Sequence, residues 1–241
     1  MRVEYEELAS IVARGAKELG IDLPSGAAFA FNSYFDLIEK RGMDINLTAI
    51  SGEENTARLH FLDSLALLKI YEFKDARVID VGSGAGFPGV PLKLAEPSID
   101  LTLLDATGKR IAFLSELCSV LGISASCVHA RAEEAAHRQD MREQFDIALS
   151  RAVGRLNILC ELCLPFVCVG GMFIAMKGVD SSEEIADARE GITALGAQLQ
   201  NSVDYAIPEA GITHRAVLIR KTANTPDKHP RRFARIQKHP L

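Results

Sequence analysis

The residues with the clearest chemical signature form a glycine-rich loop that directly follows an apolar run. Val78, Ile79 and Val81 make up that run, and the chain continues as Gly82-Ser-Gly-Ala-Gly86-Phe-Pro88. Glycines let the backbone approach a ligand closely, and a proline suits the first turn of a following helix. The segment therefore predicts a strand, a tight turn and a helix that together bind a nucleotide-type ligand.

Two classes of ligand fit this loop. Gly84-Ala-Gly86-Phe-Pro-Gly89 matches the dinucleotide pattern G-x-G-x-x-G, which is weak evidence by itself. Asp80 precedes the loop, where a carboxylate suits a cationic ligand such as S-adenosylmethionine better than a pyrophosphate. Its structural alternative is a hydrogen bond to the loop amides. Asp105 ends a second apolar run, and both ligand classes use an acid there to bind ribose hydroxyls.

Alternating strands and helices are expected to position these residues. Apolar patterning predicts strands at 77–81, 101–105, 125–129, 145–149, 172–176, 198–205 and 213–220. Helices are expected from Pro88 and over 109–121, 132–139, 154–164 and 182–195. Such alternation means an α/β fold with a mostly parallel sheet, closed by a terminal antiparallel hairpin. This order fits the Rossmann-like class I methyltransferase fold better than a dinucleotide dehydrogenase.

Helices are also expected ahead of this core. Two amphipathic helices come first, and the second ends at Gly42. Ser51-Gly-Glu-Glu54 fits a capping box that opens a third helix, which carries Arg58, His60, Asp63 and Ser64. We therefore divide the chain into a helical extension (1–70) packed on the core, a methyltransferase-like core (71–221) and a basic tail (222–241).

Composition limits the class of protein. With 241 residues, 48% of them hydrophobic, the chain can bury one substantial core. The net charge is -5, yet the tail carries five Lys or Arg side chains and one Asp. A basic tail is compatible with nucleic-acid binding through a local patch, although charge alone favours a solvated, poorly ordered terminus.

The odd count of five cysteines, without a secretory or membrane segment, indicates reduced thiols in a cytoplasmic protein. Cys160 and Cys163 follow a helical apolar pattern and are expected to be buried packing residues rather than metal ligands.

Several short motifs occur in the order of one family. They are Asn46-Leu-Thr48, Arg58-Leu-His60-Phe-Leu-Asp63-Ser64, Asp80 to Gly89, Leu104 to Arg110, Arg131-Ala-Glu133 and Ser150-Arg-Ala152. On these motifs the chain resembles the RsmG (GidB) family, whose members use S-adenosylmethionine to methylate N7 of a guanine in the 530 loop of 16S ribosomal RNA. The resemblance covers nearly the whole chain, including a tail similar to that of Gram-positive members. Those members often carry Tyr-Pro-Arg and then glycine, whereas this chain has His229-Pro-Arg231 and then Arg232.

The resemblance implies a set of cofactor-binding residues at the carboxyl ends of the strands. Gly82, Gly84 and Phe87 would line the methionine part, Asp105 would bind the ribose, and the Ala132-Glu133 backbone would bind the adenine edge. Asp80 and Arg151 complete this set. For Phe87 the structural alternative is a core aromatic, and for Glu133 it is an acid favoured at the first turn of a helix.

Methyl transfer to guanine N7 needs no general base, because the lone pair on N7 is already free. Positioning of the two reactants can then account for most of the rate acceleration. His60 is therefore expected to be a packing or hydrogen-bonding residue beneath the site rather than a proton donor. The fourth strand is followed by Ser150-Arg-Ala-Val153 rather than Asn/Asp-Pro-Pro-Tyr/Phe, and the chain has no Pro-Cys dipeptide. Both observations favour a ring nitrogen over an amine or a carbon as the methyl acceptor.

Substrate contacts can be placed only as hypotheses. Arg151 is the best candidate for a catalytic residue that contacts the base. Other cations that could hold RNA phosphates are Lys109, Arg110, Arg155, Lys177, Arg231 and Arg232, although each also fits a solvated surface charge. The implied partner is 16S ribosomal RNA within the small subunit or an assembly intermediate, with no metal and no membrane. A small-molecule methyltransferase and a non-catalytic S-adenosylmethionine sensor remain as alternatives.

Overall fold

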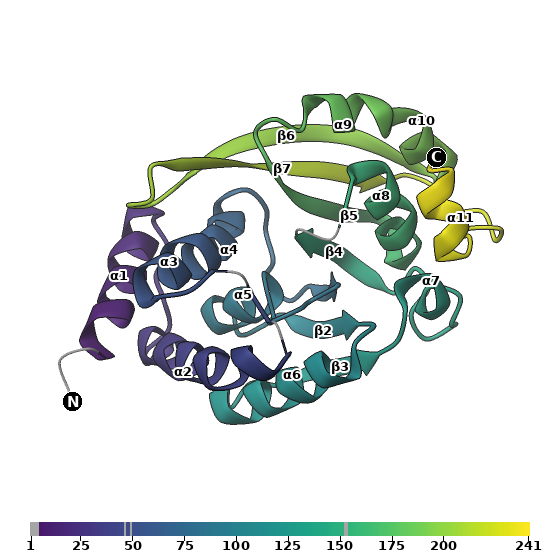
Figure 1. The fold of residues 1–241 in the computed structure, drawn as a ribbon. Coiled ribbons are helices and arrows are strands. Elements are labelled where there is room, and N and C mark those ends of the chain that lie inside the picture. Colours follow the sequence, from purple (N-terminus) through teal and green to yellow (C-terminus); the bar gives the residue numbers. More distant parts are fainter. Residues whose placement is uncertain (1–4, 46, 49, 152–153) are drawn as a thin grey trace.

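A single seven-stranded sheet organises the protein. The computed structural model describes residues 5–45, 47–48, 50–151 and 154–241, so Asn46 and Ala152 of the motifs above lie outside the described residues. The strand order is β3-β2-β1-β4-β5-β7-β6 (Figure 1). The strands are β1 (Arg77–Val81), β2 (Asp100–Asp105), β3 (Ala125–His129), β4 (Phe145–Arg151), β5 (Val167–Gly178), β6 (Ala197–Ile207) and β7 (Ile212–Lys221). β1 to β5 pair in parallel, and β7 runs antiparallel to β5 and β6, so the predicted sheet with a terminal hairpin is confirmed.

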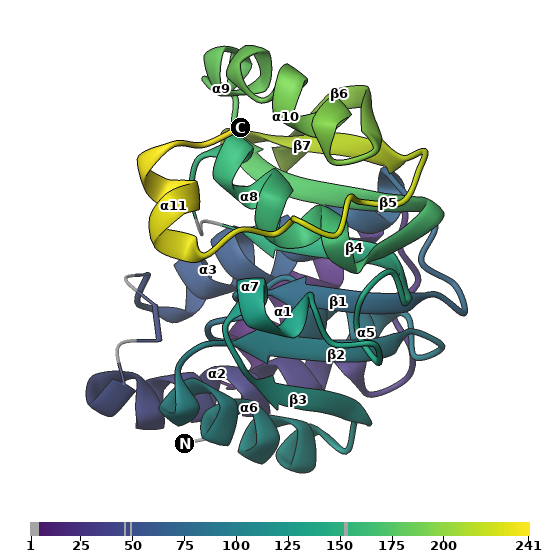
Figure 2. The same ribbon diagram turned by 90° about the vertical axis from the view of Figure 1, so that its right-hand side faces the viewer.

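Helices cover both faces of the sheet because side chains alternate along each strand. Val78 belongs to one buried cluster, with the helices before β1, and Ile79 belongs to a second, with α8. Figure 2 shows α8 and α11 in front of the sheet and α1 behind it. The helices are α1 (Tyr5–Glu18), α2 (Ala27–Ile45), α3 (Glu53–Thr56), α4 (Asp63–Leu65), α5 (Gly89–Ala95), α6 (Gly108–Leu121), α7 (Ala132–Ala135), α8 (Leu156–Cys163), α9 (Ser182–Asp187), α10 (Arg189–Ala194) and α11 (Phe233–Lys238).

Four expected helices differ from the prediction. The second helix does not end at Gly42 but continues to Ile45. The helix expected over 132–139 ends at Ala135, and the one expected over 182–195 is divided into α9 and α10. The capping box is wrong, because the N-cap of α3 is Gly52 and no described side chain caps it. The third helix continues from α3 to Lys69, and it contains the π-helical turn η1 (Ala57–Leu62) and the 3₁₀ turn η2 (Ala66–Lys69). π-Helical turns are frequent at functional sites, and this one carries His60.

The tail is a packed part of the fold, so the expectation of a poorly ordered terminus is wrong. Figure 2 shows it passing in front of the sheet beside α8. Glu161 of α8 is fully buried, and its carboxylate accepts hydrogen bonds from His229 Nδ1 at 2.9 Å and from the Arg231 guanidinium at 2.6 Å. Burial acts to raise the pKa of Glu161, but these bonds hold it below its usual value. Arg231 therefore anchors the tail, and its guanidinium is not a free cation for RNA.

The two cysteines of α8 pack in the core as expected. Cys160 and Cys163 are both fully buried, and burial raises the pKa of each thiol. These cysteines therefore contribute volume to the second cluster rather than reactive thiolates. In the part of the chain that the structure describes, none of the helices has the length and apolar character needed to cross a membrane.

Replacing Glu161 by alanine should destabilise the protein, because it leaves the Arg231 guanidinium without its buried partner. We expect the free energy of unfolding to fall by about 3–5 kcal/mol in chemical denaturation followed by circular dichroism. The matched control is Asp187→Ala, which removes the exposed partner of Arg155 and should cost less than about 1 kcal/mol. Equal losses in the two variants would show that the buried pair does not hold the tail.

Candidate active site

The glycine loop forms one wall of a cavity of about 590 Å³ at the carboxyl ends of β1, β2 and β4. Five of the predicted cofactor-binding residues line this cavity: Gly82, Gly84, Phe87, Asp105 and Arg151. The other three, Asp80, Ala132 and Glu133, are described by the structure but are not among the lining residues. The volume falls within the range of small-molecule sites, so the cavity is large enough for a nucleoside-type ligand.

The loop has its shape because its glycines adopt backbone angles that other residues avoid. Gly82, Gly84 and Gly86 have φ values of 76°, 58° and 101°. A Cβ on Gly86 would lie 2.5 Å from the hydroxyl oxygen of Tyr34, which donates a hydrogen bond to the Ala85 carbonyl at 2.6 Å. The loop is therefore fixed from beneath by an aromatic residue of α2.

Asp80 supports the loop from inside the protein. Its carboxyl is fully buried, and Oδ2 accepts a hydrogen bond from the Gly89 amide at 2.9 Å. Burial raises the pKa of Asp80 to about 7, although the Gly89 amide and Arg151 both act in the opposite direction. This geometry corresponds to the structural alternative stated for Asp80, a bond to a loop amide.

Asp105 faces the cavity and is held by two backbone amides. Its Oδ2 accepts from Gly84 N at 3.1 Å, and its Oδ1 accepts from Thr107 N at 2.8 Å. The Arg110 guanidinium lies 3.6 Å from Oδ2. Each carboxylate oxygen keeps a second lone pair, so Asp105 can still accept hydrogen bonds from a ribose. The loop and this carboxylate together fit the nucleoside part of S-adenosylmethionine.

Arg151 closes the opposite end of the cavity, and its guanidinium is fixed in place. It donates to Asp63 Oδ2 at 3.1 Å, to the Leu59 carbonyl at 3.2 Å and to His60 Nδ1 at 2.8 Å. It also lies 4.8 Å from the centre of the Phe87 ring, a cation–π contact. A residue held by this many partners forms a rigid wall rather than a mobile arm.

His60 is a packing and hydrogen-bonding residue, as expected from the sequence. Its ring stacks on Phe87 with centroids 4.4 Å apart, and Nε2 lies 2.7 Å from Thr48 Oγ1. Burial, with the nearby charge of Arg151, lowers the pKa of His60 to about 3. The ring is thus neutral at physiological pH. Because Arg151 donates to Nδ1, the hydrogen of the ring lies on Nε2 and is donated to Thr48.

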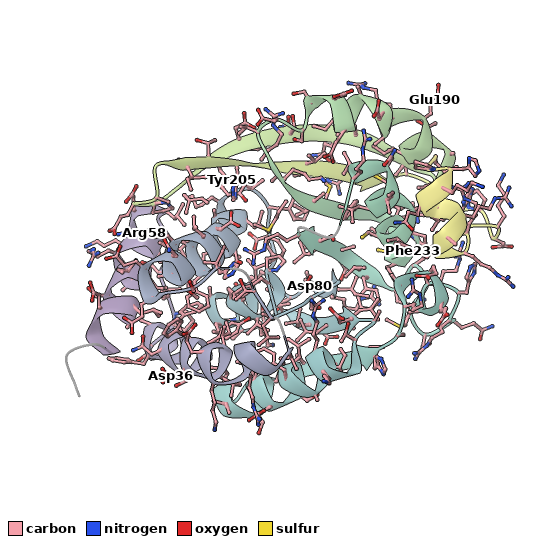
Figure 3. All side chains as sticks on the ribbon, viewed as in Figure 1. Asp36, Arg58, Asp80, Glu190, Tyr205 and Phe233 are labelled. Atoms are coloured by element: carbon pink, nitrogen blue, oxygen red, sulfur yellow. The ribbon has the colours of Figure 1, made fainter. Side chains whose placement is uncertain are left out.

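Asp63 connects three strands to the N-terminal helices. Besides Arg151 of β4, its carboxylate accepts from the Tyr205 hydroxyl of β6 and from His214 Nδ1 of β7, each at 2.9 Å. Figure 3 shows Tyr205 just above the segment that contains α4, and Asp80 near the middle of the molecule. The hydrogen bond that His214 donates to Asp63 raises the pKa of His214, which favours its protonated form. Sequence reasoning missed Tyr205 and His214, since a single polar residue in the edge strand β6 or in its neighbour β7 carries no local signal.

A second cavity, of about 480 Å³, lies on the other side of Arg151. It shares Ile50, His60 and Arg151 with the first cavity. Beyond this shared wall it is lined by the end of β5, by α9 and the residues before it, and by His214 of β7. Two ligands bound side by side would therefore meet at Arg151.

The predicted RNA-binding cations are divided between the cavities and the outer surface. Arg110 lines the first cavity and Lys177 the second, where its Nζ lies 2.6 Å from Glu184. Lys109 belongs to α6 and lines a small pocket beside α2, outside both cavities. Arg155 is exposed and pairs with Asp187 at 2.8 Å, and Arg232 is exposed at the start of α11.

The matching family model and the curated relatives indicate the same family. Residues 28–213 match the family model GidB, described as rRNA small subunit methyltransferase G. A curated relative named ribosomal RNA small subunit methyltransferase G, from Alkaliphilus oremlandii, is 43% identical over 98% of this chain and 99% of its own length. One of the same name from Clostridium tetani is 40% identical over 96% of this chain and 98% of its own.

Solved structures share the fold at low sequence identity. A branched-chain polyamine synthase from Thermus thermophilus has a TM-score of 0.59, with 13% identity over 85% of this chain and 66% of its own. A SAM-dependent methyltransferase from Aquifex aeolicus has a TM-score of 0.50, with 17% identity over 68% of this chain and 92% of its own. These similarities support the class I methyltransferase architecture.

Asp63→Asn should lower the pKa of His214, because the Asp63 carboxylate is the main cause of its rise. Titration of the His214 ring by NMR measures this change. Tyr205→Phe is the control, since it keeps the carboxylate and should leave the His214 pKa near that of the wild type. An unchanged pKa in Asp63→Asn would contradict the hydrogen bond.

The same pair should make stability depend on pH. A pKa that is raised in the folded state adds stability that is complete below the unfolded value of about 6.5 and is lost as the pH rises through the folded value. Asp63→Asn should therefore lower the free energy of unfolding more at about pH 6 than at about pH 9. An equal loss at both pH values would exclude the contribution of His214.

Proposed function

The chain belongs to the rRNA small subunit methyltransferase G family, and on that premise we propose that it transfers a methyl group from S-adenosylmethionine to N7 of a guanine in the 530 loop of 16S ribosomal RNA. The observation that carries this proposal is the pair of cavities that share Arg151 as a wall. The first cavity has the glycine loop and the Asp105 carboxylate expected of a nucleoside site. The second cavity adjoins it at Arg151, where a methyl group would pass from donor to acceptor.

The residues of the first cavity would hold the methyl donor in one orientation. Asp105 accepts hydrogen bonds from the ribose, and the backbone at Gly82 and Gly84 leaves room for the methionine part. S-adenosylmethionine supplies an activated methyl group on a positively charged sulfur. The N7 lone pair forms the new N–C bond, and the electrons of the broken C–S bond stay on sulfur, so no proton has to move.

The polar groups of the shared wall suit a reaction without acid–base catalysis. His60 is neutral, and both of its ring nitrogens are already hydrogen-bonded. Arg151 is a donor only and is held by Asp63. The main contribution to the rate acceleration would then be positioning, which aligns N7 with the methyl group. The small ribosomal subunit or one of its assembly intermediates is our proposed form of the substrate.

Methyl mapping tests the proposed function directly. Purified protein is incubated with labelled S-adenosylmethionine and small subunits from a strain that lacks this modification. Nuclease digestion and mass spectrometry then locate the methyl group. A single N7-methylguanine in the 530 loop supports the proposal. Transfer to another position, or none, contradicts it.

Asp105→Ala should weaken binding of S-adenosylmethionine. Loss of hydrogen bonds to a charged acceptor costs about 1.5–3 kcal/mol, which is roughly a ten- to hundredfold rise in Kd. Isothermal titration calorimetry measures the affinity. Asp100→Ala is the matched control, because Asp100 is an exposed acid at the opposite end of the same strand and should leave Kd unchanged. Equal affinities for the two variants would remove Asp105 from the cofactor site.

A further inference from the structure

We propose that the second cavity holds the target guanine, and that the Glu184 carboxylate selects this base by accepting hydrogen bonds from its Watson–Crick edge. The proposal rests on the proposed function and adds to it the residue that recognises the base. It starts from the position of Glu184 on α9, at the part of the second cavity beyond Arg151.

Glu184 is prepared as a hydrogen-bond acceptor. Its Oε2 accepts from Lys177 Nζ at 2.6 Å and from the Leu156 amide at 3.0 Å. Among the described residues, none donates a hydrogen bond to Oε1. Burial acts to raise the pKa of Glu184, but Lys177 and the Leu156 amide hold it below its usual value, so the group is ionised at neutral pH. An ionised carboxylate can accept hydrogen bonds but cannot donate them.

A carboxylate that only accepts hydrogen bonds matches guanine better than adenine. Guanine has donors at N1 and N2 on its Watson–Crick edge, whereas its acceptor N7 lies on the Hoogsteen edge. Adenine has an acceptor at N1, which would face the Glu184 carboxylate unfavourably. A guanine whose Watson–Crick edge meets Glu184 would turn N7 back toward Arg151. The same contact would thus select the base and aim its nucleophile.

The rest of the cavity suits a base better than a phosphate. Ile50, Leu59 and Met176 supply apolar surface for the faces of a purine ring. The cations that line the cavity are already paired, with Arg151 and His214 bound to Asp63 and Lys177 bound to Glu184. Little uncompensated positive charge remains there to attract a phosphate.

Ser181 provides an independent sign that a polar ligand binds here. It lines the second cavity and is only 5% exposed. Within the described part of the chain, its buried hydroxyl has no hydrogen-bond partner. An unsatisfied buried hydroxyl is costly, and such groups are uncommon in folded proteins. If its hydroxyl rotates toward the cavity, a polar group of the bound base would satisfy it.

A kinetic comparison tests the role of Glu184. Glu184→Gln replaces one of the two acceptor oxygens by an NH2 donor and should lower kcat/KM for the RNA about 10- to 100-fold. Its Kd for S-adenosylmethionine should stay at the wild-type value. Glu183→Gln is the matched control, because Glu183 is exposed on the same helix and lies outside the cavity, so wild-type kinetics are expected. Wild-type kcat/KM in Glu184→Gln would overturn the proposal.

A binding measurement separates this proposal from the proposed function, because it needs no methyl transfer. Saturation-transfer NMR with S-adenosylhomocysteine present would compare guanosine, inosine and adenosine. The wild type should prefer guanosine over inosine, which lacks the N2 amine, and over adenosine. Glu184→Gln should lose both preferences. Equal binding of the three nucleosides to the wild type, or no binding of guanosine, would overturn the proposal. A wild-type protein that prefers guanosine but leaves the 530 loop unmodified would contradict only the proposed function.

Discussion

The buried carboxylate of Asp63 is the constraint on which the geometry of the site depends. Its side chain is 2% exposed, and it accepts hydrogen bonds from residues of β4, β6 and β7. A buried charge costs several kcal/mol unless it is paired and hydrogen-bonded. The three donors are therefore held together around one point of the N-terminal helices. This joins those helices to strands that lie far away in the sequence.

The fixed position of Arg151 follows from this constraint. With its guanidinium bound to Asp63 and His60, Arg151 separates two cavities instead of reaching into solvent. The glycine loop and Asp105 shape the first cavity, and the end of β5 and α9 shape the second. A reaction that needs alignment rather than proton transfer is well served by such a rigid partition.

Local patterns in the sequence predicted much of the fold. The seven strands, the terminal hairpin, the loop at Gly82 and the acid at Asp105 all follow from periodicity and from glycine and carboxylate placement. Interactions between distant residues could not be read in this way. The partners of Asp63 on β6 and β7 come from opposite strands of one hairpin, and Glu161 meets Arg231 only after the tail folds back. A charged tail looks the same in sequence whether it is solvated or bound to a buried acid.

The most direct test of the central claim is a crystal structure of the protein with S-adenosylhomocysteine and guanosine. We predict the ribose of the first ligand at Asp105, its sulfur beside Arg151, and the guanine in the second cavity with N7 facing that sulfur. A guanine bound elsewhere, or an Arg151 side chain released from Asp63 to open one continuous cavity, would contradict the account.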